Sequence, residues 1–128
     1  MNYEEFIRVV QERGQMRTER DTLIAIEATL KTLGERLTDL QAARLASLLP
    51  FEIGLFLTVV DTNKDYSLNS FFRHVAAREG QPLDDSMGHA LAVISVLEDT
   101  LPPGELQGTL AALPEDYKKL MHMKNGWG

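Results

Sequence analysis

The apolar residues of this chain recur at intervals of three and four, and this spacing is what most restricts its fold. The clearest run is Leu23, Ile26, Leu30, Leu33 and Leu37, at steps of 3, 4, 3 and 4. A helix turns once in about 3.6 residues, so this run lies on one side of an α-helix. No segment shows the alternation that predicts a half-buried strand. The sequence therefore predicts an all-α fold of packed amphipathic helices.

Capping residues and prolines divide the chain into short helices. Thr18 and Ser67 suit the N-cap positions of the helices that follow them. Thr38 and Gln41 form a capping-box pattern, in which each side chain bonds the other's backbone. Proline suits the first turn of a helix, so a helix is predicted from Pro50 to about Val60.

Two further local predictions concern how individual helices begin and which side they bury. Asp84 or Asp85 is expected to cap the long helix that follows Pro82. The residues after Thr38 that are expected to point inward are Leu40, Ala43, Leu48 and Leu49. The tail, residues 125–128, contains two glycines and is predicted to be non-helical.

The second half of the chain repeats the first. With a shift of 65, residues 6–13 lie on residues 71–78 and match at four of eight positions. The matching pairs are Phe6 and Phe71, Arg8 and Arg73, Val10 and Val75, and Arg13 and Arg78. After the next loop the shift becomes 64, and Leu49-Pro50 lies on Leu113-Pro114. Such self-similarity indicates a duplicated unit.

The repeat predicts the domain organisation. Residues 1–128 are expected to form a single globular helical bundle made of two pseudo-repeats, each of about four helices. The copies span about 3–60 and 68–123, and the polar segment 61–67 connects them. Each copy is expected to cover the apolar face of the other.

Two copies of Phe-x-Arg-x-Val, each followed by a long helix and a short helix that ends in Leu-Pro, resemble a bacterial domain-of-unknown-function family, number 2267. The resemblance covers residues 1–123. It implies a tandem all-helical fold without an established activity, and it supplies no site residues.

Composition excludes several classes of protein. The chain has no cysteine, so disulfides and thiolate metal sites are excluded. Its net charge of −6 disfavours nucleic acid, and the basic group Arg13, Arg17, Arg20 and Lys31 is interrupted by acidic residues. The longest apolar stretch, Ile53 to Val60, is too short to cross a membrane. A cytoplasmic location is expected, because the acidic N-terminus does not resemble a signal peptide.

The connector partly matches a calcium-binding loop. Asp61, Asn63 and Asp65 occupy the first, third and fifth positions of an EF-hand loop. However, Tyr66 replaces the glycine of the sharp turn, and Phe72 replaces the closing glutamate. A polar linker is the favoured interpretation, and weak calcium binding is the alternative.

The histidines and carboxylates predict no catalytic residue, metal ligand or cofactor. No two of His74, His89 and His122 lie three or four residues apart. A metal site would need His74, with Glu79 or Asp84, to converge on His89. The adjacent carboxylate pairs are Asp84-Asp85, Glu98-Asp99 and Glu115-Asp116. Neighbouring side chains on a helix diverge by about 100°, so a shared proton is not expected. These patterns favour a non-enzymatic role.

The two copies differ in the helix that follows their shared proline. Phe51 and Leu55 of the first copy correspond to Glu115 and Lys119 of the second. The first helix is apolar nearly all round, so either the second half covers it or part of it is exposed as an interface. The predicted contacts are Phe51, Leu55 and Val59.

The function that follows from this helix is a non-catalytic protein-interaction module, with a homodimer as one form. The alternative is a small-molecule-binding or enzymatic bundle whose site lies between the two halves.

Overall fold

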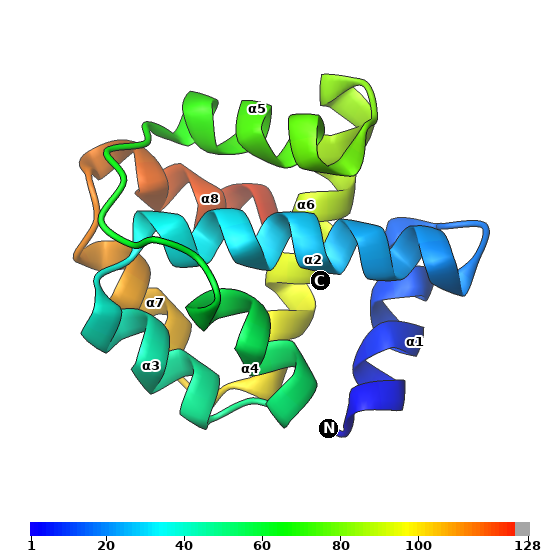
Figure 1. The fold of residues 1–128 in the computed structure, drawn as a ribbon, viewed down its shortest axis with the longest axis horizontal. Coiled ribbons are helices and arrows are strands. Elements are labelled where there is room, and N and C mark those ends of the chain that lie inside the picture. The colour runs from blue at the N-terminus through cyan, green and yellow to red at the C-terminus, as the bar shows by residue number, and fades with distance from the viewer. Residues whose placement is uncertain (125–128) are drawn as a thin grey trace.

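The two longest helices, α2 (Glu19–Arg36) and α6 (Leu83–Thr100), form the centre of the fold. In the computed structural model, which describes residues 1–124, α2 crosses the front of the molecule and α6 passes behind it (Figure 1). Helix α5 packs on one side of α2 and α4 on the other, while α7 and α8 pack on α6. The described residues contain no strand, so the all-α prediction is confirmed for them.

The remaining helices are short. The first half contains α1 (Tyr3–Gly14), α3 (Asp39–Ser47) and α4 (Phe51–Thr58) in addition to α2. The second half contains α5 (Leu68–Glu79), α7 (Glu105–Ala111), a 3₁₀ turn (Glu115–Tyr117) and α8 (Lys118–Lys124) in addition to α6. In chain order the helices of the first half have 12, 18, 9 and 8 residues. The predicted non-helical tail, residues 125–128, lies outside the described residues.

Three of the predicted helix caps are confirmed. The hydroxyl oxygens of Thr18 and Ser67 accept hydrogen bonds from backbone N–H groups at 3.0 and 3.1 Å. Thr38 and Gln41 form the reciprocal capping box. The predicted cap of α6 is wrong, because the helix begins directly after Pro82 and so includes both aspartates in its first turn. There they still face the positive end of the helix dipole.

The hydrophobic core is one cluster to which all the described helices contribute. In α3 the buried residues are Ala42 and Leu45, whereas Leu40 is 84% exposed and Ala43 is also exposed. The inward prediction for Leu40 and Ala43 is therefore wrong. Helix α3 packs on α4 and α7, and of the two residues predicted inward after the helix, Leu49 is buried and Leu48 is half-buried.

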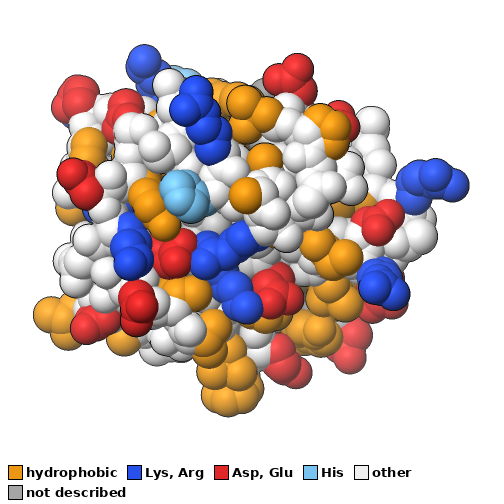
Figure 2. Space-filling view, turned by 45° about the horizontal axis from the view of Figure 1, so that its top comes forward, with side chains coloured by type: hydrophobic (Ala, Val, Ile, Leu, Met, Phe, Trp, Pro, Cys, Tyr) orange, Lys and Arg blue, Asp and Glu red, His pale blue; other side chains and the backbone are white. Residues whose placement is uncertain are grey.

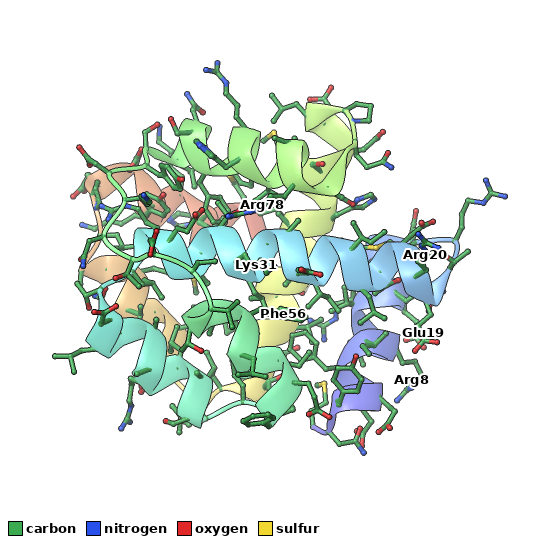
Figure 3. The ribbon with its side chains drawn as sticks, in the orientation of Figure 1. Arg8, Glu19, Arg20, Lys31, Phe56 and Arg78 are labelled. Atoms are coloured by element: carbon green, nitrogen blue, oxygen red, sulfur yellow. The ribbon has the colours of Figure 1, made fainter. Side chains whose placement is uncertain are left out.

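Two arginines connect the halves in the same way. Arg13 of α1 pairs with Asp99 of α6 at 2.5 Å, and Arg78 of α5 pairs with Glu35 of α2 at 2.6 Å. Figure 3 shows Arg78 in the space between α5 and α2. The same guanidinium groups donate to the hydroxyls of Ser95 and Thr32 at 2.8 and 3.0 Å. The first helix of each half is thus bound to the long helix of the other.

A glycine allows α2 and α4 to touch through their backbones. A Cβ atom added to Gly34 of α2 would lie 2.2 Å from the carbonyl oxygen of Leu57 in α4. A Cβ atom on Gly54 of α4 would lie 2.7 Å from the carbonyl oxygen of Ala46 in α3. Helix α4 is therefore held between α2 and α3 by contacts that no larger residue permits.

We expect Gly34→Ala to destabilise the protein by about 1–3 kcal/mol, because the added methyl group forces α2 and α4 apart. Gly88→Ala is the matched control: Gly88 also lies in a long helix, but nothing lies within 4 Å of its Cβ position. The control should gain about 0.5–1 kcal/mol from helix propensity. Urea denaturation followed by circular dichroism measures both values. Equal effects of the two variants would contradict the close approach.

Candidate functional site

One face of α4 carries exposed apolar side chains, which we call the α4 stripe: Phe51, Leu55 and Val59. These side chains are 74%, 40% and 59% exposed. They recur every four residues, so they lie on one side of α4, with Val59 directly after the last residue of the helix. The opposite side is fully buried at Ile53 and Leu57. The interpretation in which the second half covers the whole helix therefore does not hold for this face.

The position of α4 explains why the stripe is exposed. The helix is docked through Gly54 against α3 and through the Leu57 carbonyl against α2, so its remaining side faces outward. Figure 2 shows hydrophobic side chains protruding at the lower edge of the molecule, and α3, α4 and the start of α1 lie toward that edge in Figure 1. Among residues 1–124, the other large exposed apolar residues are Met1, Ile24, Leu40 and Leu83. These four lie on separate elements, and single exposed apolar residues are common on protein surfaces.

The histidines separate into different environments. His74 is exposed and its ring stacks on Tyr66 with 4.1 Å between centroids. His122 is exposed on α8. The side chain of His89 is 24% exposed, and its Nδ1 atom lies 2.5 Å from a carboxylate oxygen of Glu79. Glu79 thus converges on His89 and His74 does not. Among residues 1–124, no group of three or more potential ligands could hold a metal ion.

The Glu79 carboxylate is almost entirely removed from solvent. Its side chain is 4% exposed. One oxygen accepts a hydrogen bond from the Ser86 hydroxyl at 2.7 Å, and the other contacts the His89 ring. These two donors compensate for the water that the buried carboxylate has lost. Ser86 was not predicted as part of this contact, although its position three residues before His89 places both on one face of α6.

A cleft lies where the turn between α1 and α2 meets the turn between α5 and α6; we call it the turn cleft. Its volume is about 370 Å³. The lining residues are Gln15, Met16, Arg17, Asp21, Ile24, Glu79, Gln81, Asp85 and His89. Residues from both halves of the chain form its walls, as the alternative function requires.

The connector is held by backbone contacts to the end of α2. The N–H groups of Asn63 and Lys64 donate to the carbonyl oxygens of Leu37 and Glu35 at 2.8 and 2.7 Å. The buried Tyr117 hydroxyl donates to the carbonyl oxygen of Tyr66 at 2.9 Å. These contacts hold the connector against the C-terminal end of α2, and within residues 1–124 no group of three or more His, Asp or Glu side chains could hold a metal ion.

Basic side chains lie beside acidic ones. Lys31 pairs with Glu27 at 2.6 Å, and Arg13 pairs with Asp99. On the face seen in Figure 2, blue and red side chains are interspersed and form no continuous basic stripe. Within residues 1–124, no helix has the length and apolar character needed to cross a membrane.

Glu35 is the carboxylate that binds Arg78 across the two halves. Burial raises the pKa of Glu35, but hydrogen bonds from Arg78 and Tyr66 and the positive charge of Arg78 outweigh burial. The pKa of Glu35 therefore lies below its ordinary value. The contact between α2 and α5 thus depends on an ionised carboxylate.

The fold and the sites define an all-α bundle with an exposed apolar stripe and a polar cleft between its halves. The chain belongs to the family described as "Uncharacterized conserved protein (DUF2267)", whose family model matches residues 3–120. The resemblance seen in the sequence is thereby confirmed, while bacterial origin and cytoplasmic location stay predictions. The comparison with curated proteins gives no match.

We expect Arg78→Met to lower the free energy of unfolding at pH 7 by about 1–3 kcal/mol, because it leaves the charged Glu35 without its main partner. A carboxylate with a lowered pKa stabilises the fold above its unfolded-state pKa of about 4.3, and this contribution is lost in more acidic solution. The difference between wild type and variant should therefore shrink as the pH falls below about 4.

Arg73→Met is the control, because Arg73 is an exposed arginine on the same helix. Its effect should be within about 0.5 kcal/mol at every pH. Urea denaturation from pH 3 to 7 measures these differences. A pH-independent effect of Arg78→Met would contradict the role given to Glu35.

Proposed function

We propose that this chain is a non-catalytic protein-interaction module whose contact surface is the α4 stripe, and that its partner is a second copy of the chain. The observation that carries the proposal is the exposure of Phe51, which is 74% exposed beside two further apolar residues on one face. Adjacent apolar side chains on a surface otherwise rich in charge are typical of an interface.

The stripe has the symmetry that a pair of identical chains requires. A twofold axis through Leu55 would align two copies of α4 antiparallel, with Phe51 of one copy opposite Val59 of the other. A large side chain would then face a smaller one. The same axis places Glu52 opposite Thr58, so the exposed glutamates of the two copies do not face each other. This arrangement joins apolar surfaces without bringing like charges together.

The size of the stripe predicts weak association. Helix α4 has eight residues and is about 12 Å long, so its stripe is smaller than the roughly 800 Å² that each partner buries in a standard interface. Removing Phe51 or Leu55 from water contributes on the order of 1.5–3 kcal/mol each. The net charge of −6 on each copy opposes association and is screened by salt. A dimer held by this stripe should therefore strengthen as salt increases.

The duplication explains why the assembly would end at two copies. We infer that residues 1–128 are one domain of two copies, about 3–60 and 68–123, joined by 61–67. Similar helix lengths and the two reciprocal arginine contacts support this inference. The second copy carries Glu115 and Lys119 where the first has Phe51 and Leu55. Each chain then presents one apolar stripe, and a twofold pair uses both.

A second candidate function is favoured by a separate observation. The turn cleft draws polar and apolar residues from both halves, as a small-molecule site requires. This candidate does not compete with the first, because none of the residues that line the cleft belongs to the α4 stripe.

We expect Phe51→Glu to weaken dimerisation at least about tenfold, because it removes two apolar contacts from a symmetric interface and adds two negative charges. The variant should fold normally, since Phe51 is exposed and glutamate is favoured in a first helical turn. Leu40→Glu is the matched control: Leu40 is 84% exposed in the first turn of α3 and is not part of the α4 stripe.

Sedimentation velocity over a range of protein and salt concentrations measures the association. The wild type and Leu40→Glu should form a reversible dimer that tightens with salt, and Phe51→Glu should stay monomeric at the same concentrations. A wild type that is strictly monomeric at millimolar concentration would overturn the proposed partner. A dimer that Phe51→Glu leaves unchanged would show that a different surface is used.

A further inference from the structure

We propose that the turn cleft binds a small organic cation with primary amino groups, and that His89, held by Glu79, is its anchor. The site is independent of the proposed interaction function, because its residues and those of the α4 stripe do not overlap.

The contact with Glu79 sets the orientation of the His89 ring and the nitrogen that carries its proton. Nδ1 contacts the buried Glu79 carboxylate, so this nitrogen carries the proton of the contact and donates it. Ser86 donates to the other oxygen of Glu79, and no lysine or arginine among the described residues pairs with this carboxylate. The ring is thereby fixed, and Nε2 remains as its free polar atom on a side chain that lines the cleft. In the neutral ring, Nε2 accepts a hydrogen bond.

The walls of the turn cleft carry a net negative charge. Three carboxylates line the cleft, those of Glu79, Asp21 and Asp85, and Arg17 is the single lysine or arginine among the lining residues. The lining is therefore net negative whether or not His89 carries a second proton. The N-terminal ends of α2 and α6, which carry partial positive charge, also lie at the cleft. Thr18 caps α2, and the negative charges of Asp21 and Asp85 in the first turns offset the two helix dipoles. This balance favours a cation over an anion.

The size and lining of the turn cleft suit a small ligand that is partly apolar. The volume of about 370 Å³ lies at the small end of the range for ligand pockets. Met16 and Ile24 add apolar surface between the polar groups. An aliphatic diamine matches both parts, because its methylene chain can lie on the apolar wall while its ammonium groups donate to Nε2 of His89 and to the aspartates.

The test uses the full chain and 1,5-diaminopentane as the probe. Isothermal titration calorimetry and ¹H–¹⁵N chemical shifts should both report binding at one site, with the largest shifts in the two turns that form the cleft. Glutarate, a dianion of similar length, is the control ligand and should produce neither signal.

Variants locate the site. Asp85→Asn should weaken diamine binding about tenfold or more, because it removes a charge-assisted hydrogen bond. Asp84→Asn is its matched control: it makes the same change of charge in the same helical turn, at a residue that does not line the cleft. His89→Phe should abolish binding while keeping the bulk of the ring. Because that variant leaves Glu79 without a partner, its thermal unfolding is measured in parallel, and Asp85→Asn tests the site even where His89→Phe is unstable.

Three results would overturn the proposal. The first is the absence of heat and of shift changes at millimolar diamine. The second is glutarate binding as tightly as the diamine, which would contradict the assignment of a cation. The third is an equal loss of affinity in Asp84→Asn and Asp85→Asn, which would indicate attraction to the acidic surface in general. None of these results bears on dimerisation through the α4 stripe, which sedimentation tests separately.

Discussion

The two arginine contacts between the halves are the directional links in a fold whose core is otherwise held together by apolar packing. Arg13 binds Asp99 and Arg78 binds Glu35, so each first helix is joined to the last part of the other half's long helix. Arginine is favoured there, because the C-terminal end of a helix is negative. The core supplies the energy of folding, but apolar contacts are non-directional. The arginine contacts add direction where these helices meet, and the turn cleft lies between the turns next to them.

The backbone contacts of α4 follow from the same arrangement and determine its exposed face. Gly34 admits the Leu57 carbonyl, and α4 lies so close to α2 that only its outer side remains free. A helix in this position needs an apolar inner face, and here the outer face is apolar as well. Burial cannot account for the outer residues, because they are not buried. The interface that we propose would account for them in the same physical terms that explain the core.

Features that depend on neighbouring residues, such as helices and their caps, could be predicted from the sequence. Features that depend on residues distant in the chain, such as which side of a helix is buried, could not. Periodicity and capping chemistry identified the helices, because both act within a few residues. The side of α3 that is buried could not be predicted, because Leu40 and Leu45 are equally apolar and packing on α4 and α7 decides between them. The contact of Glu79 with His89 was only one option, because it depends on how the chain turns between α5 and α6.

The proposed duplication separates scaffold from function. Arg13 and Arg78 occupy matching positions and make matching contacts, as expected of residues that hold both copies together. The residues of the two proposed sites do not match. Phe51 corresponds to Glu115, and with the shift of 64 His89 corresponds to Ala25. In the proposed alignment the apolar stripe therefore lies in the first copy only, and the histidine of the cleft in the second copy only. Positions that differ between copies are not required by the shared fold, so their chemistry is free to serve binding.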